Sequence, residues 1–282
     1  MTTGLAARAC PVCGGAHAKP LFARDGFDLV ECSSCQLVFV AQDPATIDFQ
    51  QLYGESYYRG GHDAVFSDYT GQEAARRRSA RRKLWALRHL PPRIAHRGRL
   101  LDVGCAAGFF LAEAQARYQV QGVELSAWSS AYAREQLSLK VFTGTLAQAS
   151  LPSAVFDVIT LWDVIEHVPE PVALLADAAR VLATNGRLVL TTGDWGSAYA
   201  QRRGVHWHLM TPPWHLTMFS RATLTEAARR AGLRVLALKS EGVAGDGRLW
   251  RNPLSLLLSR ALGLGDIMRV TLAHDHAARP NR

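Results

Sequence analysis

Four of the five cysteines have the spacing of a metal site. They form two pairs in the pattern Cys10-x2-Cys13-x18-Cys32-x2-Cys35. Two such pairs are typical of structural zinc sites, in which four thiolates complete a tetrahedron and leave no position for water. A segment of about 45 residues is too short to build a large core, so the metal would replace that core. We expect structural Zn²⁺ here, the alternative being four unrelated buried thiols.

Small residues follow an apolar segment at positions 100–108, which read LLDVGCAAG. Small residues let a ligand approach the backbone, and free N–H groups at a helix start favour an anionic group such as a carboxylate. Glu124 ends the next apolar segment, 22 residues after Asp102 (124 − 102). An acid at that place in such folds accepts hydrogen bonds from a ribose diol. The pattern predicts a nucleoside-binding turn, the alternative being a turn that only packs helix on strand.

Two histidines are candidates for a general base. His167 lies in WDVIEHVPEP and His215 in PPWHLTMFS, each after a predicted element at the carboxyl edge of the sheet. Ligands of open α/β folds bind at that edge. A neutral imidazole there can remove a proton from a hydroxyl or a carbon acid. We favour His215 as the base, and the alternative for each is a hydrogen-bonded loop histidine.

Aromatic and histidine side chains crowd the segment that precedes His215. A loop so rich in rings indicates either a substrate wall or a hydrophobic lid packed for stability. These residues are Trp195, Tyr199, His206, Trp207, His208 and Trp214.

A second chemistry is open at the segment that contains His167. Asp163, Glu166 and His167 have the i, i+3, i+4 spacing that places side chains on one helix face. Such a face could ligate a hard divalent ion. A divalent-metal site at these three residues is therefore an alternative to a metal-free base.

The elements that position these residues alternate between short apolar strands and amphipathic helices. This alternation is typical of βαβ units and a parallel sheet. Strands are expected at 27–30, 36–40, 99–103, 120–124, 139–142, 156–161, 187–192, 233–238 and 268–273. Helices are expected at 72–90, 109–118, 127–137, 171–186, 223–231 and 253–262. The fold class predicted is α/β, a Rossmann-like, doubly wound, mainly parallel sheet closed by antiparallel strands, with a small zinc-ribbon-like module at the N-terminus.

The composition is that of an ordinary globular protein, with 282 residues, 48% hydrophobic and 20% charged. The N-terminus has no secretion signal pattern and no apolar run is long enough for a membrane span, so we expect a cytoplasmic protein. The segment from Arg76 to Arg99 contains nine Arg, one Lys and no Asp or Glu, so its formal charge is +10. The whole chain has a net charge of +8, so the rest of the chain sums to −2 (8 − 10). This segment is either a solvated helix face or an anion-binding patch.

Residues of about 98 to 240 resemble the class I S-adenosylmethionine-dependent methyltransferases. LDVGCAAGFF is similar to their first motif, VELS to their second, FDVITLWDVIEHVPEP to their fourth, and NGRLVLTT to their fifth strand. The resemblance implies S-adenosylmethionine as cofactor, with Asp102 near its amino group and Glu124 on its ribose hydroxyls. Gly104, Ala106 and Gly108 would line the methionine end, and Ala106 departs from the usual glycine. The remaining cofactor contacts implied are Thr145, Leu146, Trp162 and Asp163.

A zinc module ahead of such a domain looks like the sugar C-methyltransferases that act on nucleotide-linked ketosugars. WHLTMFS is similar to their EHLxxFS, which implies that His215 is their basic histidine and His167 a second site histidine. Tyr57 or Tyr58 would lie near their substrate tyrosine. Trp214 replaces their glutamate, so we expect it to contact the acceptor.

These features predict an S-adenosylmethionine-dependent methyltransferase of a small, anionic acceptor such as a sugar or nucleotide sugar, methylated at oxygen or carbon. One alternative is an RNA methyltransferase that binds nucleic acid through the zinc module and the basic helix. Another is a non-catalytic module that binds the cofactor and serves in assembly. The expected domains are a zinc module (1–45), an aromatic and basic connector (46–97), the cofactor-binding domain (98–240) and a closing helix and strand (241–282).

Overall fold

The computed structural model describes residues 8–60, 68–87, 98–241 and 265–275. The predicted helix at 253–262 and residues 88–97 of the basic segment lie outside these residues. The chain divides into two compact units. One unit comprises Met1–Ile47, Asp163–Ala176 and Leu190–Arg282, and the other comprises Asp48–Trp162 and Asp177–Val189.

The unit that contains Asp48–Trp162 holds the predicted nucleoside-binding turn. Strand β4 pairs in parallel with both β5 and β7, and β5 pairs in parallel with β6. Helix α6 begins at Ser126, whose hydroxyl accepts the amide hydrogen of Ser129, as a good N-cap does. The elements are α1 (Phe49–Leu52), α2 (Glu55–Arg59), α3 (Glu73–Ala86), β4 (Arg99–Val103), α5 (Phe109–Ala114), β5 (Gln119–Glu124), α6 (Ala127–Leu137), β6 (Val141–Thr143) and β7 (Phe156–Trp162).

The core of this unit forms where α5 and α3 cover β4. Leu100, Leu111 and Val158 are fully buried in it. Helix α3 packs on α5, and the Arg77 guanidinium donates to the carboxylate of Glu113 at 3.0 Å across the two helices. Because a parallel strand is covered on both faces, the four residues of β4 after Arg99 are buried, and three of them are apolar. The fourth is Asp102, and a buried acid indicates a functional role.

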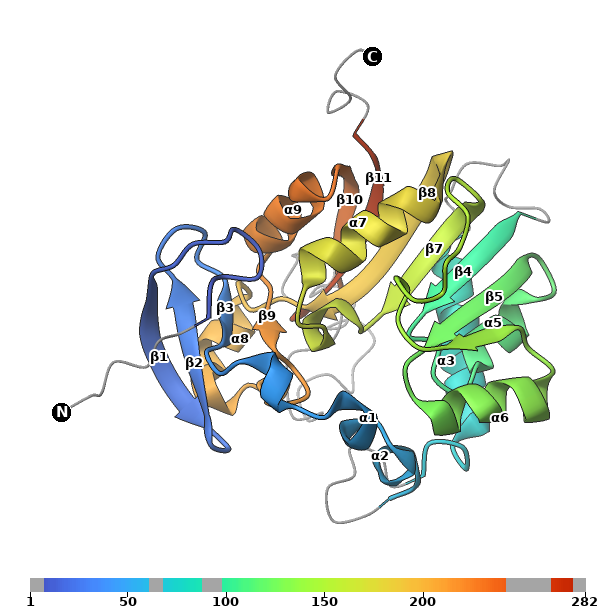
Figure 1. Cartoon of the computed structure of the whole chain (residues 1–282), viewed down its shortest axis with the longest axis horizontal. Helices are drawn as coiled ribbons and strands as arrows, with labels where there is room; N and C mark the ends of the chain where they lie inside the picture. Colours follow the sequence, from blue (N-terminus) through green and yellow to red (C-terminus); the bar gives the residue numbers. More distant parts are fainter. Residues whose placement is uncertain (1–7, 61–67, 88–97, 242–264, 276–282) are drawn as a thin grey trace, which may run out of the picture. The chain divides into compact units, whose positions relative to one another are not determined.

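The other unit contains the cysteine module and the C-terminal half. An antiparallel sheet has the order β1-β2-β3-β9, so a strand from the C-terminal half lies beside β3 of the module (Figure 1). Its elements are β1 (Ala18–Arg24), β2 (Phe27–Cys32), β3 (Val38–Val40), η1 (Pro44–Thr46), η3 (Ile165–His167), α8 (Ala198–Arg203), η4 (Gly204–His206), β9 (Thr217–Met218), α9 (Arg221–Arg230), β10 (Leu233–Glu241) and β11 (Ile267–His274). Helix α7 (Pro171–Val181) and strand β8 (Leu182–Gly193) cross the division between the units.

The fold class predicted from the sequence is confirmed. Strands of the second sheet follow the order β10-β11-β8-β7-β4-β5-β6, with an antiparallel β10–β11 pair at one end. The predicted antiparallel pair at 233–238 and 268–273 is therefore correct, with both strands longer than expected. Among the described residues, no helix combines the length and apolar character needed to cross a bilayer.

Two predicted helix ends were wrong, and two strands were missed. Helix α7 ends at Val181 rather than at Asn185-Gly186, because β8 already begins at Leu182 and passes through that pair. Helix α5 ends at Ala114, four residues before the predicted end. Strands β1 and β9 were not predicted, since β1 is largely exposed and β9 is only two residues long.

Candidate functional site

The four cysteine sulfurs converge on one point in the N-terminal module. Their ligand atoms all lie within 4.8 Å of one another. The Sγ atoms of Cys10 and Cys35 are 3.5 Å apart, and those of Cys13 and Cys32 are 3.4 Å apart. A tetrahedron of sulfurs around zinc has S–S separations of about 3.8 Å. The cluster thus has the size and donor set for zinc, and the fifth cysteine, Cys105, belongs to the other unit.

Glu124 is held by two backbone amides at the end of β5. Its Oε2 accepts the amide hydrogen of Ala106 and its Oε1 that of Ser126, each at 2.8 Å. Its side chain is buried, and burial raises the pKa of this carboxyl despite the two hydrogen bonds. A buried carboxylate whose oxygens each keep a free acceptor position can bind two adjacent hydroxyls, as a ribose diol presents them.

Asp102 lies on β4, the strand that pairs with β5, and its side chain is also buried. The Thr160 hydroxyl donates to Asp102 Oδ1 at 2.5 Å. Burial raises the pKa of Asp102 to about 7, with Thr160 and Lys83 opposing the shift. A cationic amino group would stabilise the ionised carboxylate and offset this cost of burial. The sequence resemblance assigns the amino group of the cofactor to this carboxylate.

The turn between β4 and α5 brings backbone close to Glu124. Gly104 and Gly108 have φ of +72° and +82°, and Ala106 has φ of +48°. A Cβ on Gly108 would meet Leu139 Cδ1 at 2.5 Å, so this position requires glycine. Ala106 adopts the left-handed region at a modest cost, and the hydrogen bond that its backbone N–H donates to Glu124 offsets that cost. The turn therefore accommodates an alanine at position 106, where the family pattern has glycine.

The other residues predicted to contact the cofactor have different environments. Thr145 is exposed, and its amide donates to Gln148 Oε1 at 2.8 Å, whereas Leu146 is fully buried. Trp162 packs edge-on against Phe110, with the Lys83 ammonium 4.9 Å from its ring centroid. Asp163, which belongs to the other unit, accepts a hydrogen bond from the Thr191 hydroxyl at 2.7 Å.

The predicted substrate tyrosines belong to an aromatic cluster in the unit of β4. The Tyr58 ring stacks on Trp128 at 5.4 Å and meets Tyr57 edge-on at 5.0 Å. Tyr69 meets Tyr58 edge-on, and burial raises its pKa to about 12. The charge of Glu124 also raises the pKa of both Tyr58 and Tyr69, as a smaller cause than burial. Tyr58 is buried and Tyr57 half-buried, so of the two Tyr57 has more surface to offer an acceptor.

The two candidate bases form a pair in the unit of the cysteine module. The imidazole centroids of His167 and His215 are 4.6 Å apart and the rings meet edge-on. His167 Nδ1 lies 2.8 Å from the Trp214 carbonyl oxygen, and His215 Nδ1 lies 2.6 Å from the Leu209 carbonyl oxygen. A carbonyl only accepts, so both Nδ1 atoms carry the hydrogen and both Nε2 atoms keep a lone pair. Burial lowers the pKa of His215 and, together with the His215 charge, that of His167 to about 3.

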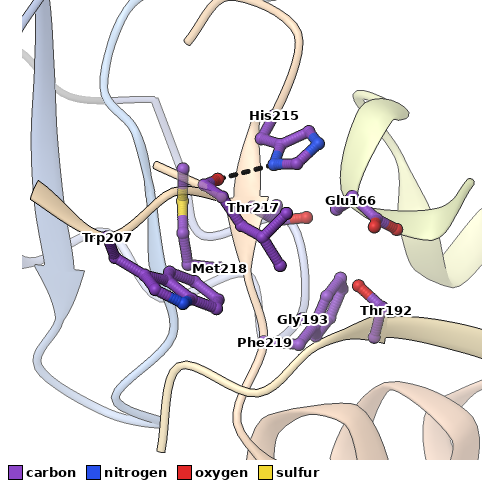
Figure 2. Close-up of a pocket in the computed structure, with 9 residues that line it drawn as sticks. Glu166, Thr192, Gly193, Trp207, His215, Thr217, Met218 and Phe219 are labelled. Atoms are coloured by element: carbon purple, nitrogen blue, oxygen red, sulfur yellow. Dashed lines mark hydrogen bonds between the residues drawn. The ribbon is translucent and has the colours of Figure 1, made fainter. Parts of the chain in front are cut away.

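Glu166 completes a cluster with the two histidines. One ligand atom from each of the three residues lies within 4.8 Å of the others. Figure 2 shows Glu166, Thr192 and His215 around a small pocket. Within the described residues, Glu166 Oε2 and the hydroxyls of Thr192 and Thr217 are buried without a hydrogen-bond partner. Burial, followed by the charge of Asp163, raises the pKa of Glu166 to about 8.

The prediction that Asp163, Glu166 and His167 share one helix face is wrong for Asp163. Helical geometry covers only Ile165–His167, and Asp163 precedes it with φ of +58°. The structure groups Glu166 and His167 with His215 instead, a residue 48 positions after His167 (215 − 167). Trp214, the third residue expected near the acceptor, supplies its carbonyl to His167.

Two buried acids that no motif indicated support the loop before His215. Asp266 is 1% exposed and accepts the indole hydrogen of Trp207 at 2.9 Å. The Asp194 amide donates to the Asp266 carbonyl, and the Asp194 carboxylate binds the Arg221 guanidinium at 2.9 Å. Single acids in loops give no periodic signal, so only the structure identifies them.

A model of the methyltransferase domain family matches residues 73–238 of this chain. Among curated proteins, the chain is 32% identical over 155 residues to the ubiquinone biosynthesis O-methyltransferase of Rhodopseudomonas palustris, covering 48% of this chain and 61% of that protein. The enzyme of the same name from Schizosaccharomyces pombe mitochondria is 34% identical over 104 residues, with 33% and 37% covered. The chain thus spans about half the length of the curated relatives it matches.

Solved structures share the fold at low sequence identity. Geranyl diphosphate C-methyltransferase from Streptomyces coelicolor A3(2), solved with Mg²⁺, geranyl diphosphate and S-adenosyl-L-homocysteine, has a TM-score of 0.56 and 16% identity. The similarity covers 83% of this chain and 99% of that one. An S-adenosylmethionine-dependent methyltransferase from Mesorhizobium loti has a TM-score of 0.51 and 18% identity, with 67% and 96% covered.

Proposed function

Because this chain belongs to the methyltransferase domain family and has the S-adenosylmethionine-dependent methyltransferase fold, we propose that it methylates a small hydroxylated acceptor, with His215 as general base. The acceptor class we propose is a sugar or nucleotide sugar, methylated at oxygen or carbon. One observation carries the base assignment. Backbone carbonyls fix the tautomers of His215 and His167, so both present an unprotonated Nε2.

The cofactor, when bound, supplies an activated methyl group on a sulfonium. The residues of this chain have two remaining tasks, which are to align donor and acceptor and to take up the acceptor proton. Glu124 would bind the ribose hydroxyls and Asp102 the amino group. Gly104, Ala106 and Gly108 would allow the methionine end to approach the backbone, with Thr145, Leu146, Trp162 and Asp163 around the rest.

His215 would receive the acceptor proton at Nε2. Its Nδ1 hydrogen bond to Leu209 orients the ring and stabilises the imidazolium that forms. Burial disfavours that imidazolium, which makes His215 a weak base at rest and favours return of the proton after transfer. An acceptor O–H or C–H made acidic by a neighbouring carbonyl suits such a base, as in a ketosugar.

The acceptor proposal is tested by a mass-spectrometric screen with methyl-labelled cofactor. Sugar nucleotides, free sugars and phenolic diols are incubated separately, and products are searched for a gain of one labelled methyl group. A labelled sugar product supports the proposal, and a labelled phenol with unreacted sugars contradicts the acceptor class. Cofactor binding without a product from any pool would favour the non-catalytic assembly role.

A second candidate is metal-assisted O-methylation at the cluster of Glu166, His167 and His215. The observation that favours it is the buried cluster, in which one carboxylate oxygen of Glu166 and one ring nitrogen of each histidine lie within 4.8 Å of one another. Glu166 Oε2 has no hydrogen-bond partner in the described part of the chain. A divalent ion there would lower the pKa of a bound hydroxyl. Titration of metal-free enzyme with Mg²⁺ and Zn²⁺ distinguishes the candidates, because turnover unchanged by either ion supports a metal-free base.

RNA methylation receives less support from the structure. Two arginines of the basic helix α3, Arg77 and Arg81, are ion-paired with Glu113 at 3.0 and 3.1 Å. Part of the basic segment is therefore neutralised by the protein itself. An affinity for RNA that falls steeply with salt concentration would support this alternative.

We further propose structural Zn²⁺ at Cys10, Cys13, Cys32 and Cys35, whose converging sulfurs fit a closed site. A cytoplasmic location remains a proposal, as does the division into 1–45, 46–97, 98–240 and 241–282. Acceptor contacts at Tyr57, Tyr58 and Trp214 are proposed on the sequence resemblance.

A further inference from the structure

The segment that carries His215 is paired with the cysteine module. Strand β9 is antiparallel to β3, with Phe39 opposite Thr217 and Val38 opposite Met218. The Val40 amide extends this ladder by donating to the Leu216 carbonyl at 2.9 Å. Strand β3 itself is bonded to β2, which ends at Cys32. A continuous antiparallel sheet therefore leads from the metal-capable cysteines to the residue next to His215.

Leu216 also joins the two halves of the histidine cluster. Its amide donates to the Glu166 carbonyl at 2.8 Å, while its own carbonyl accepts from Val40. Its side chain is fully buried. Leu216 is thus held between Val40 and the residue that precedes His167, and displacement of β3 would change the separation of the two imidazoles.

Arg8 makes a second link between the same parts. Its Nε donates to the Val40 carbonyl and its Nη1 to the Pro169 carbonyl, each at 3.2 Å. The guanidinium carbon lies 5.6 Å from the centroid of the Phe39 ring. Burial lowers the pKa of Arg8, with Glu170 and Asp43 opposing the shift, and the group is too basic to lose its charge.

The planar guanidinium is suited to this bridge because its donors have a fixed geometry. One end of the bridge is the end of β3, and the other is two residues after His167. Arg8 lies two residues before Cys10. The segment that leads into the cysteine cluster therefore also binds the segment that follows His167. Arg8 reaches the two histidine segments through its contacts with Val40, Phe39 and Pro169.

We propose that Arg8 is a positioning residue for methyl transfer, and that it acts with strand β3 of the cysteine module to hold His167 and His215 at their working separation. The cysteine module is then a structural part of the acceptor site. The proposal rests on the assignment of the histidines to that site. A misplacement of about 1 Å at a reacting group is enough to lower turnover by roughly two orders of magnitude.

The test compares Arg8→Ala and Arg8→Lys in the full chain with bound S-adenosylmethionine. Hydrogen–deuterium exchange is measured for peptides that contain Leu216 and His167, and diethyl pyrocarbonate labelling reports access to the two imidazoles. Arg180→Ala is the matched control, because Arg180 also donates to a backbone carbonyl, that of Leu151, but in the other unit. Calorimetry with S-adenosylmethionine checks the cofactor site in every variant.

We expect Arg8→Ala to raise exchange at Leu216 and the labelling rate of the histidines by about tenfold, since one of two links is lost. Arg8→Lys should recover part of the effect, because an ammonium can reach one carbonyl but not bridge two in the same fork geometry. Cofactor affinity should stay within twofold in all variants, and Arg180→Ala should leave the histidine peptides unchanged. Removal of metal by a chelator should raise exchange in the same peptides.

Unchanged exchange and labelling in Arg8→Ala would overturn the proposal, as would an equal increase throughout both units. These readouts do not require turnover. Full activity of a His215→Ala variant would instead remove the proposed base while leaving the positioning result intact, so the two failures can be distinguished.

Discussion

Glu124 Oε2 accepts the amide hydrogen of Ala106 at 2.8 Å, which joins the end of β5 to the turn that follows β4. The other oxygen of Glu124 binds the Ser126 amide at the start of α6. One carboxylate therefore connects three elements of the predicted cofactor site. Its orientation is fixed before any ligand arrives, so a ribose diol would meet a preorganised acceptor.

Glu124→Gln should weaken S-adenosylmethionine binding by one to two orders of magnitude. An amide has only one acceptor oxygen, so it loses either the Ala106 or the Ser126 bond and presents a donor to the ribose. Calorimetry measures the affinity. Glu135→Gln on the exposed side of α6 is the control and should bind normally. Equal affinity in both variants would remove Glu124 from the ribose site.

Asp102→Asn should change how stability depends on pH in the cofactor-free protein. Burial raises the pKa of Asp102 from 3.8 to about 7 in the folded state. The folded state therefore binds this proton more tightly than the unfolded state, and the resulting contribution to stability is complete below pH 3.8 and is lost as the pH rises to 7. Asparagine does not titrate. The free energy of unfolding of wild type should therefore fall by about 3 kcal/mol relative to the variant between pH 5 and pH 8, two pKa units at about 1.4 kcal/mol each.

Urea unfolding at the two pH values measures this difference. A constant gap between wild type and Asp102→Asn would show that Asp102 is ionised throughout, and the assigned burial effect would be incorrect. The cofactor should abolish part of the pH dependence, because its amino group stabilises the carboxylate.

His215→Asn and His215→Gln separate the two nitrogens of the ring. Asparagine can keep the Nδ1-type bond to Leu209 but lacks Nε2, whereas glutamine can approach the Nε2 position but loses that bond. Neither amide is a base, so turnover of the acceptor identified by the screen should fall by about 10² to 10⁴ in both. Cofactor affinity should not change. A His215→Asn enzyme with normal turnover would show that Nε2 takes no proton.

Metal analysis should find about one zinc per chain, bound by the four-cysteine cluster. Cys13→Ser should lose most of the metal and lower the thermal midpoint, since structural zinc supplies folding free energy to a small module. Cys105→Ala is the control for metal content, because Cys105 lies in the other unit. A well-folded protein that purifies without metal would contradict the zinc proposal.

The sequence was sufficient where local pattern decides structure. The apolar runs predicted as strands at 99–103 and 156–161 correspond to β4 and β7. Ser126 is the N-cap of α6, as its residue type predicts. The end of α7 was misplaced because Asn185-Gly186 looks like a helix stop but lies inside β8. Tertiary pairing thus overrode a local signal.

The histidine cluster shows what sequence spacing cannot provide. Glu166 and His167 are neighbours in the chain, and helical periodicity assigned Asp163 to them. The third member, His215, is brought in by β9, a two-residue strand with no periodic pattern of its own. Its partner β3 was predicted, but nothing in the sequence paired the two. Arg8 and Asp266 were missed for the same reason, since their bonds join residues far apart in the chain.

The central claim is that Asp102 and Glu124 form the binding site of S-adenosylmethionine. A crystal structure of the full chain with S-adenosylhomocysteine tests it most directly. We predict both ribose hydroxyls within hydrogen-bonding distance of Glu124 and the amino group on the side of Asp102. A nucleoside bound elsewhere, or a turn without bound nucleoside at saturating ligand, would contradict this assignment.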